Sequence, residues 1–333
     1  MKAKSLNTFL LLLTGQFILA ASLNLASASE LYFIDAHSQL DHRVDDPELV
    51  IQRMDESNVY RTILAARSKR QPGEIVDMAE YHPQRIVPAV RTKSGAYNTD
   101  NPKYYKKMKK QLRDGRFKAM AEILLYHAQK GDKAPEVMVY PDDPRVKFAL
   151  NAAIEHHWPF VIHIEFASLQ GKQRQQFMQK MKNLLAENPN HAIVLNHLGQ
   201  LRANELAPLL RQYQNLHVLT AHTNPAIITH SNQPWSNMFD GKKLSSEWKD
   251  LILQHPNQFV FALDNVWERH WREFYPEQMA YWKSALADLP SEVAHAVAHG
   301  NAERLWQLAD PGRDERGRVR VLRAGTGGAR SRL

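Results

Sequence analysis

The sequence of 333 residues contains no cysteine. This absence excludes a disulfide framework, a thiolate zinc site, an iron–sulfur cluster and a cysteine nucleophile. It also excludes the acylated cysteine that anchors a bacterial lipoprotein. A metal site in this chain would have to be built from histidine, carboxylate or amide ligands.

Long hydrophobic runs are also scarce, and the clearest one lies at the N-terminus. Lys2 and Lys4 precede the apolar stretch from Phe9 to Ala21, and Ala26-Ser27-Ala28 supplies a small-residue cleavage pattern. Polar residues interrupt the stretch, which is short for a membrane span. We therefore expect residues 1–28 to be a cleaved signal peptide. The mature protein is then expected to be periplasmic or secreted, with no membrane partner.

The main part of the chain carries almost no net charge. The whole sequence has a net charge of +8, to which residues 1–28 contribute +2 and residues 312–333 contribute +5. The 283 residues between them therefore carry only +1. An arginine-rich tail can bind nucleic acid, but exported proteins rarely meet nucleic acid. We interpret residues 312–333 as a disordered Arg/Gly-rich tail and expect no nucleic-acid partner.

Short apolar runs alternate with longer amphipathic stretches between residues 29 and 311. Most of these runs are continuous rather than alternating in hydrophobicity, which is typical of parallel strands buried on both faces. The predicted strands are Leu31–Ala36, Thr62–Ala66, Ile86–Arg91, Lys118–Leu124, Phe160–Glu165, Ala192–Asn196, Leu216–Thr220 and Phe259–Asp264.

The stretches between these strands have helical patterns with clear ends. Helices are predicted at Pro47–Asn58, Asp143–His156, Gly171–Glu187 and Ala203–Tyr213, with stops at Asn188-Pro189 and His255-Pro256. Eight strand–helix units in one chain indicate an α/β fold of the (β/α)8 TIM-barrel class, for which about 250 residues is typical. An open, doubly wound sheet is disfavoured because no glycine-rich phosphate loop follows a strand. Residues 29–311 are expected to form a single domain.

Histidines and carboxylates gather at the carboxyl ends of the predicted strands. His37 and Gln39 end the first strand, and the other such residues are Glu122, His163, His197 and Asp264. The carboxyl ends of barrel strands meet at one mouth, where catalytic residues of this fold lie. Imidazoles and carboxylates that converge there are suitable ligands for Zn²⁺ or a similar divalent ion.

These residues resemble the site of the amidohydrolase superfamily, in its amidohydrolase-related branch of metal-dependent hydrolases, decarboxylases, hydratases and lactonases. Asp35 and His37 match the start of the family's D-x-H-x-H motif, and Gly300-Asn301-Ala302 resembles the branch's terminal signature. The resemblance implies metal ligation by His37, His163, His197 and Asp264. It also gives Glu122 the position of an acidic group that some members use in binding metal.

Gln39 departs from the family pattern, which has a histidine at this position. A glutamine amide oxygen can ligate a divalent ion, but it is neutral and a poorer donor to Zn²⁺ than imidazole. We expect one divalent metal ion, and zinc is the ion that fits best. His37, His163 and Asp264 would hold it, with Gln39 or water completing the coordination shell. Metal-free operation is the alternative that Gln39 leaves open.

The expected activity is hydrolysis of a small carbonyl substrate, such as a lactone, amide or ester, by metal-activated water. Asp264 would move the proton, His197 would polarise the substrate, and Glu122 would act as a metal-associated acid or as a partner that orients a histidine. Arg91, Arg67 and His222 are assigned to binding a substrate that carries a carboxylate. Aromatic residues in segments 222–247 and 267–282 are expected to line or cover the mouth.

Two other functions remain open from the sequence. The first is non-oxidative decarboxylation, which would use much the same residues. The second is a non-catalytic periplasmic binding protein or pseudoenzyme with a degraded metal site, and Gln39 is its only direct support. A homo-oligomer is compatible with the sequence.

Overall fold

The computed structural model describes residues 31–130 and 134–309. The predicted signal peptide at 1–28 and the predicted tail at 312–333 lie outside these residues, as do the domain boundaries expected at 29 and 311. Among the described residues, no helix has both the length and the apolar character needed to cross a bilayer.

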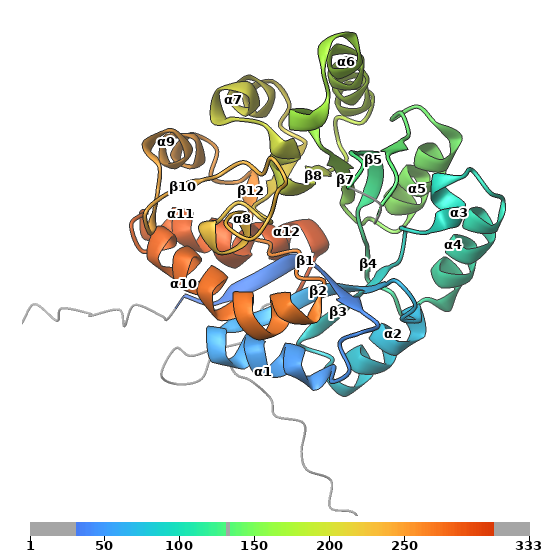
Figure 1. The fold of residues 1–333 in the computed structure, drawn as a ribbon, viewed down its shortest axis with the longest axis horizontal. Helices are drawn as coiled ribbons and strands as arrows, with labels where there is room; N and C mark the ends of the chain where they lie inside the picture. The colour runs from blue at the N-terminus through green and yellow to red at the C-terminus, as the bar shows by residue number, and fades with distance from the viewer. Residues whose placement is uncertain (1–30, 131–133, 310–333) are drawn as a thin grey trace, which may run out of the picture.

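Strands form the centre of the molecule and helices surround them (Figure 1). The parallel strands pair in the order β1-β2-β3-β4 and β12-β9-β8-β7-β5, with the short β6 antiparallel to β5. Their bounds are Phe33–Asp41 (β1), Val59–Arg67 (β2), Ile86–Val90 (β3), Ala119–Met120 (β4), Ile123–His127 (β5), Val137–Met138 (β6), Phe160–Ile164 (β7), Ile193–Leu195 (β8), Leu216–Leu219 (β9) and Phe259–Val260 (β12). A separate antiparallel pair comprises Phe239–Asp240 (β10) and Lys243–Leu244 (β11).

The fourth barrel strand is interrupted, whereas the sequence predicts one continuous strand from Lys118 to Leu124. β4 pairs with β3 and β5 pairs with β7, and the break between them contains Glu122. The carbonyl of Glu122 accepts a hydrogen bond of 2.5 Å from the hydroxyl of Thr92. At the position of the buried Glu122, a side chain of the loop after β3 therefore supplies this hydrogen bond instead of the backbone of a neighbouring strand.

Backbone hydrogen bonds close the ring between β1 and the segment after β12. Asp264 N donates to His37 O at 2.7 Å, and Gln39 N donates to Asn265 O at 2.8 Å. The last barrel strand is shorter than predicted, because Phe261 N donates to Val297 O in a π-helical turn instead of continuing the ladder. The arrangement confirms the predicted TIM-barrel class.

The helices agree closely with the sequence patterns. The predicted helices correspond to α1, α5, α6 and α7, and Asn188 and His255 are the C-caps of α6 and α9. The bounds are Glu48–Ser57 (α1), Pro72–Tyr81 (α2), Gly95–Asn98 (α3), Lys103–Asp114 (α4), Pro144–Glu155 (α5), Gly171–Glu187 (α6), Ala203–Gln212 (α7), Pro225–Ile228 (α8), Ser246–Gln254 (α9), Tyr275–Leu286 (α10), Ser291–His295 (α11) and Asn301–Trp306 (α12).

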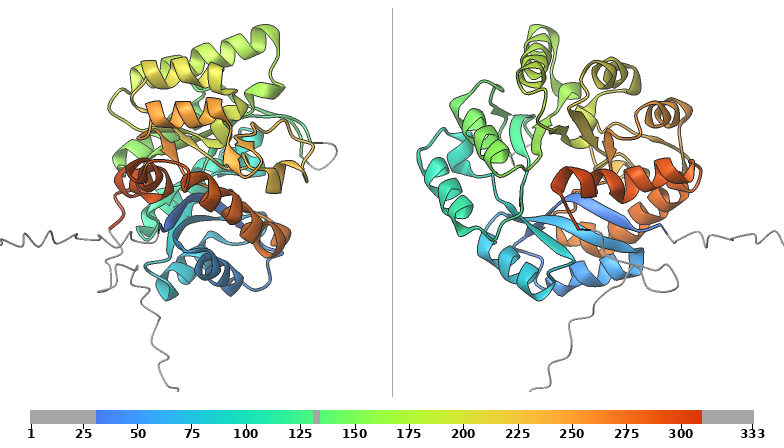
Figure 2. Two further views of the ribbon diagram at one scale, coloured as in Figure 1. Left: turned by 90° about the vertical axis from the view of Figure 1, so that its left-hand side faces the viewer. Right: turned by 180° about the vertical axis from the view of Figure 1, so that it is seen from behind.

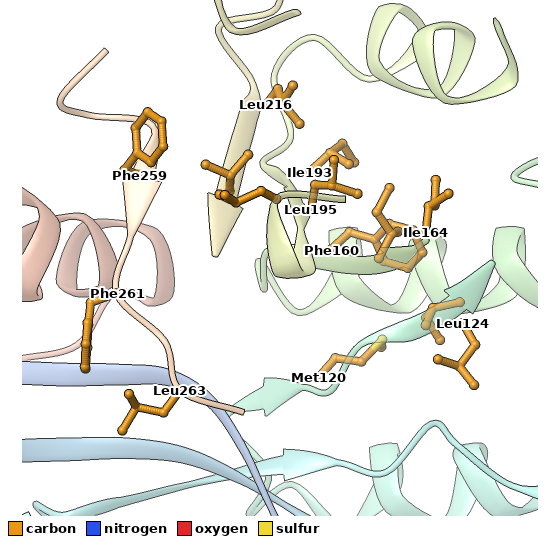
Figure 3. Packing of buried hydrophobic residues seen from close by; sticks show 14 of the residues in the cluster. Met120, Leu124, Phe160, Ile164, Ile193, Leu195, Leu216, Phe259, Phe261 and Leu263 are labelled. Atoms are coloured by element: carbon orange, nitrogen blue, oxygen red, sulfur yellow. The ribbon is translucent and has the colours of Figure 1, made fainter. Parts of the chain in front are cut away.

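Two apolar layers hold the barrel together. Larger side chains such as Phe160 and Phe259 belong to the cluster that fills the space between strands and helices (Figure 3). The interior cluster consists mainly of smaller residues on the strands, such as Ala65, Ala89 and Val161. α12 lies against β1 and adds Trp306 to this interior cluster (Figure 2).

The alternation of side chains along the strands also directs the polar residues at the barrel mouth toward the interior. His163 is two residues beyond Val161, and Asp264 is two residues beyond Ala262, and both of these apolar residues belong to the interior cluster. Side chains two residues apart in a strand point to the same face. His163 therefore projects into the barrel, and Asp264 continues the same register after the strand ends.

Candidate active site

Five strand-end residues predicted from the sequence form one buried cluster. Glu122, His163 and His197 form one group whose ligand atoms all lie within 4.8 Å of one another, and His37, Glu122 and Asp264 form another. Each of these residues is at least 96% buried. The strand ends therefore bring together histidines and carboxylates that are far apart in the sequence.

A left-handed backbone positions three residues of the mouth. His197, His222 and Asp264 have φ angles of 53°, 57° and 49°. Non-glycine residues adopt this region at a cost of about 1–2 kcal/mol each, and such strain tends to gather at functional sites. The turn that carries His197 continues through Gly199, where φ is 65° and an added Cβ would lie 2.7 Å from the Leu195 side chain.

Glu122 accepts hydrogen bonds from several donors. The Lys93 ammonium contacts Oε1, while Oε2 lies 2.9 Å from His163 Nδ1 and accepts a 2.6 Å hydrogen bond from Asn196 Nδ2. Burial alone would raise the pKa of Glu122, but the charges of Lys93 and His163 outweigh it and hold the pKa well below its usual value. Glu122 is therefore an ionised carboxylate inside the barrel.

His163 lies between two carboxylates. Its Nδ1 faces Glu122, and its Nε2 lies 3.1 Å from Glu165 Oε1. Burial opposes a charge on the imidazole, but Glu122 and Glu165 outweigh burial and raise the pKa of His163. Glu165 also accepts from Lys130 Nζ at 2.9 Å and from the backbone of Ala128 at 2.8 Å. Glu165 thus fixes the orientation of the imidazole.

Asp264 connects the other side of the cluster. Its Oδ1 accepts a 2.8 Å hydrogen bond from Gln39 Nε2, and its Oδ2 lies 3.3 Å from His197 Nε2. Burial alone would raise the pKa of Asp264, but His197 and the charge of His37 outweigh burial and hold it below the usual value. His37 Nε2 is buried without a hydrogen-bond partner, at 3.6 Å from both Glu122 Oε1 and Asp264 Oδ1.

Imidazole and indole rings cover His197. His222 stacks on it with a centroid distance of 4.9 Å, and the Trp235 ring lies 4.7 Å from it. His222 Nε2 lies 3.0 Å from the carbonyl of Asp264, and its buried Nδ1 has no hydrogen-bond partner. Burial first, and then the charge of His197, lower the pKa of His222 well below its usual value. His222 therefore lies beside the cluster as a neutral ring.

Arg67 is the last residue of β2 and Arg91 directly follows β3, and both residues are half-buried. The Arg91 guanidinium donates to the backbone carbonyls of Lys93 at 3.0 Å and Arg70 at 3.3 Å, so it is engaged in holding the loop. Burial and the nearby charge of Arg67 lower the pKa of Arg91. Within residues 31–130 and 134–309, no carboxylate forms an ion pair with either arginine.

Three further residues contact the cluster without being predicted from the sequence, namely Lys93, Asn196 and Glu165. Glu165 shares the strand face of His163 because the two are two positions apart, and this spacing could have identified it. Asn196 directly precedes His197. Lys93 follows β3 in a loop, where periodicity predicts no side-chain direction.

A cavity of about 600 Å³ lies at the opposite end of the barrel from this cluster. Its lining includes Arg61 and Ile86 near the starts of β2 and β3, Lys118 just before β4, and Trp306 of α12. None of the cluster's histidines or carboxylates contributes to the lining. The cavity is therefore separate from the candidate active site.

The fold resembles several solved structures at low sequence identity. An uncharacterised TIM-barrel protein from Bordetella bronchiseptica matches with a TM-score of 0.55 and 13% identity, over 84% of this chain and 99% of its own. An amidohydrolase from Burkholderia multivorans with bound zinc matches with a TM-score of 0.50 and 15% identity, over 84% and 100%. A 4-oxalomesaconate hydratase from Rhodopseudomonas palustris matches with a TM-score of 0.53 and 12% identity, over 83% and 95%.

Sequence comparison assigns the family more directly. No protein with a curated description matches the chain. The family model described as amidohydrolase matches residues 34–308, which include every residue of the cluster. The resemblance found in the strand-end motifs is therefore confirmed. The chain belongs to the amidohydrolase family.

Proposed function

We propose that this protein is an exported, metal-dependent hydrolase that acts on a small lactone, amide or ester carrying a carboxylate. The observation that carries the proposal is the meeting of an ionised Asp264 with His197, His163 and Glu122 in one buried cluster. This arrangement combines a proton acceptor with ligands for a divalent ion, as hydrolysis by activated water requires.

The donor set fits one divalent ion. Glu122, His163 and His197 are the residues that would hold it, and zinc suits such nitrogen and carboxylate ligands. His197 Nδ1 lies 3.1 Å from the carbonyl of Ala221 and must carry the proton there, which leaves Nε2 with a lone pair. The two ring nitrogens of His163 each face a carboxylate, Nδ1 facing Glu122 and Nε2 facing Glu165. If Nε2 donates its proton to Glu165, the lone pair of Nδ1 faces the Glu122 carboxylate, so a cation or a second proton must lie at Nδ1.

When bound, such an ion polarises a substrate carbonyl and makes a water molecule more acidic. Asp264 is placed to accept the water proton, because its low pKa keeps the carboxylate ionised at neutral pH. The hydrogen bond from Gln39 occupies Oδ1 and leaves Oδ2 facing His197. Asp264 would then return the proton to the leaving group.

The rings around His197 would define the substrate position. Trp235 contacts both His197 and His222, and Lys130 lies 5.1 Å from the Trp235 ring centre. The rings of Trp235 and His222 would then pack against one side of the substrate, next to its reacting carbonyl. Arg67 has no ion-pair partner among the described residues and acts electrostatically on Lys93, so it is the residue we assign to a substrate carboxylate.

Export is a separate part of the proposal. It is supported by Lys2 and Lys4 before an apolar stretch and by the small residues at 26–28. Mass spectrometry of protein recovered from the periplasm should show a chain that begins at Ser29. A chain that keeps residues 1–28 and stays in the cytoplasm would contradict export without affecting the enzyme assignment.

A substrate panel tests the reaction. Zinc-loaded protein should open lactones or cleave esters that carry a carboxylate, with release of acid that a pH indicator detects. If the substrate is an amide, its cleavage should release an amine that an amine-reactive dye detects. An Arg67→Met variant should raise KM for carboxylate-bearing substrates and leave KM for neutral analogues unchanged. Release of CO2 without hydrolysis would replace the proposal with decarboxylation, and ligand binding without turnover would replace it with a binding role.

A further inference from the structure

The two oxygens of Glu122 have different neighbours. Oε1 is contacted by Lys93 Nζ and lies 3.6 Å from His37 Nε2. Oε2 is contacted by His163 Nδ1 at 2.9 Å and by Asn196 Nδ2 at 2.6 Å. The carboxylate thus has one oxygen toward the lysine and the other toward His163.

Two groups of potential ligands share this carboxylate. His37 and Asp264 form the first with Glu122, and His163 and His197 form the second. A carboxylate can bind one cation through each oxygen, so the two groups are potential sites for two ions, one on each side of Glu122. Whether both groups are used depends on what else contacts Glu122.

Lys93 is held in place on the first side. Its carbonyl accepts a 3.0 Å hydrogen bond from Arg91 Nε, and the neighbouring Thr92 hydroxyl donates to the carbonyl of Glu122 at 2.5 Å. Its side chain is only 12% exposed. The backbone contacts therefore fix the loop against Glu122 and keep the ammonium at Oε1.

We propose that Lys93 limits this centre to one divalent ion, because its ammonium takes the place on Glu122 that a second ion would need. The proposal rests on the metal centre proposed above. The charges of Glu122 and Asp264 together offset one divalent ion, so the Lys93 ammonium already leaves this centre with an excess positive charge, while Glu165 is paired with Lys130. A second divalent ion beside the Lys93 ammonium would give a buried cluster a large net positive charge, which burial strongly disfavours.

The charge and position of Lys93 thus determine whether the centre binds one metal ion or two. Replacing Lys93 with methionine keeps a chain of similar length but removes the cation. Glu122 Oε1 would then be open to an ion that His37 and Asp264 also contact. Replacing Lys93 with arginine keeps the cation and should leave the count at one.

Metal counting provides the test and does not depend on turnover. Protein stripped with a chelator is reloaded with excess Zn²⁺, desalted and analysed for metal per chain. We expect one ion in the wild type and in Lys93→Arg, and two in Lys93→Met. The double variant Lys93→Met/His37→Asn should return to one. Lys118→Met, which removes an exposed lysine at the far end of the barrel, is the matched control and should hold one ion.

Loading with Mn²⁺ gives an independent readout. Electron paramagnetic resonance should show an isolated ion in the wild type and a spin-coupled pair in Lys93→Met. Two ions in the wild type, or one ion in a folded Lys93→Met, would overturn the role of Lys93. If circular dichroism shows that Lys93→Met is unfolded, Lys93→Gln takes its place with the same two outcomes. A wild type that binds no ion would instead contradict the proposed metal centre.

Discussion

Gln39 donates its side-chain amide to Oδ1 of Asp264 at 2.8 Å, across the seam where β1 meets the segment after β12. The same seam is joined by the backbone bond from Gln39 N to Asn265 O at 2.8 Å. Gln39 therefore holds the carboxylate from one side while His197 faces its other oxygen. The residue that departs from the family motif acts in this chain as a positioning residue for Asp264.

Gln39→Leu should lower kcat and leave the metal content unchanged. Loss of the amide lets the carboxylate rotate, and a misplacement of about 1 Å costs on the order of 100-fold in rate. Steady-state kinetics on a hydrolysed substrate, together with metal analysis, would measure both effects. Gln52→Leu, at an exposed position of α1, is the control. An unchanged kcat in Gln39→Leu would contradict the positioning role.

Glu165→Gln should weaken metal binding while the fold is retained. Glu165 fixes the Nε2 proton of His163, and loss of such a partner typically costs about 10–100-fold in metal affinity. Competition with a chromophoric chelator would measure the change. The same substitution at Glu155, which is exposed on α5, should have no effect. Equal affinity in the two variants would show that Glu165 does not support the ligand.

Gly199→Ala should destabilise the turn that carries His197. The added Cβ would lie 2.7 Å from the Leu195 side chain, and the alanine would have to keep a backbone φ of 65°. Overpacking and backbone strain together should lower the free energy of unfolding by about 2–4 kcal/mol. Gly115→Ala has a similar φ of 73° but open space around it, and should cost only about 1 kcal/mol. Urea unfolding compares the two, and equal losses of stability would contradict the steric argument.

Acid should destabilise the protein partly through His217 in β9. Burial lowers the pKa of this imidazole from 6.5 to about 4. Between pH 6.5 and 4, the imidazole is therefore protonated in the unfolded chain but neutral in the folded chain. The free energy of unfolding falls as the pH drops through this range. The full loss from this shift is about 3 kcal/mol.

His217→Gln removes this titration, so its unfolding free energy should depend less on pH between 6.5 and 4 than that of the wild type. His230→Gln, at an exposed position, should keep the wild-type slope. Denaturant unfolding at several pH values measures the three slopes. Identical slopes in all three proteins would show that His217 does not contribute to the acid sensitivity.

The sequence predicts the barrel and the cluster well because both depend on local periodicity. Continuous apolar runs mark strands buried on both faces, and a polar residue at the end of such a run must lie at the barrel rim. This argument places His37, His163, His197 and Asp264 without any knowledge of contacts. The break at Glu122 was not predictable, since it depends on a hydrogen bond from Thr92, a residue of another strand's loop.

Contacts made by loops account for what the sequence did not show. Lys93 reaches Glu122 from a loop, and no periodic pattern indicates the direction of a loop side chain. The position of Arg91 after β3 predicts a contact with the substrate, but its guanidinium bonds to backbone carbonyls. Metal ligation by Gln39 stays a prediction, and the hydrogen bond from its side chain to Asp264 is a contact that the motif does not indicate.

The central claim is that the buried cluster binds a divalent ion through His163. Elemental analysis of the purified mature protein, compared with His163→Ala, tests it most directly. We predict close to one ion per chain in the wild type, and its loss in a folded His163→Ala together with loss of hydrolysis. A wild type that holds no metal, or that keeps full activity after chelation, would contradict the claim.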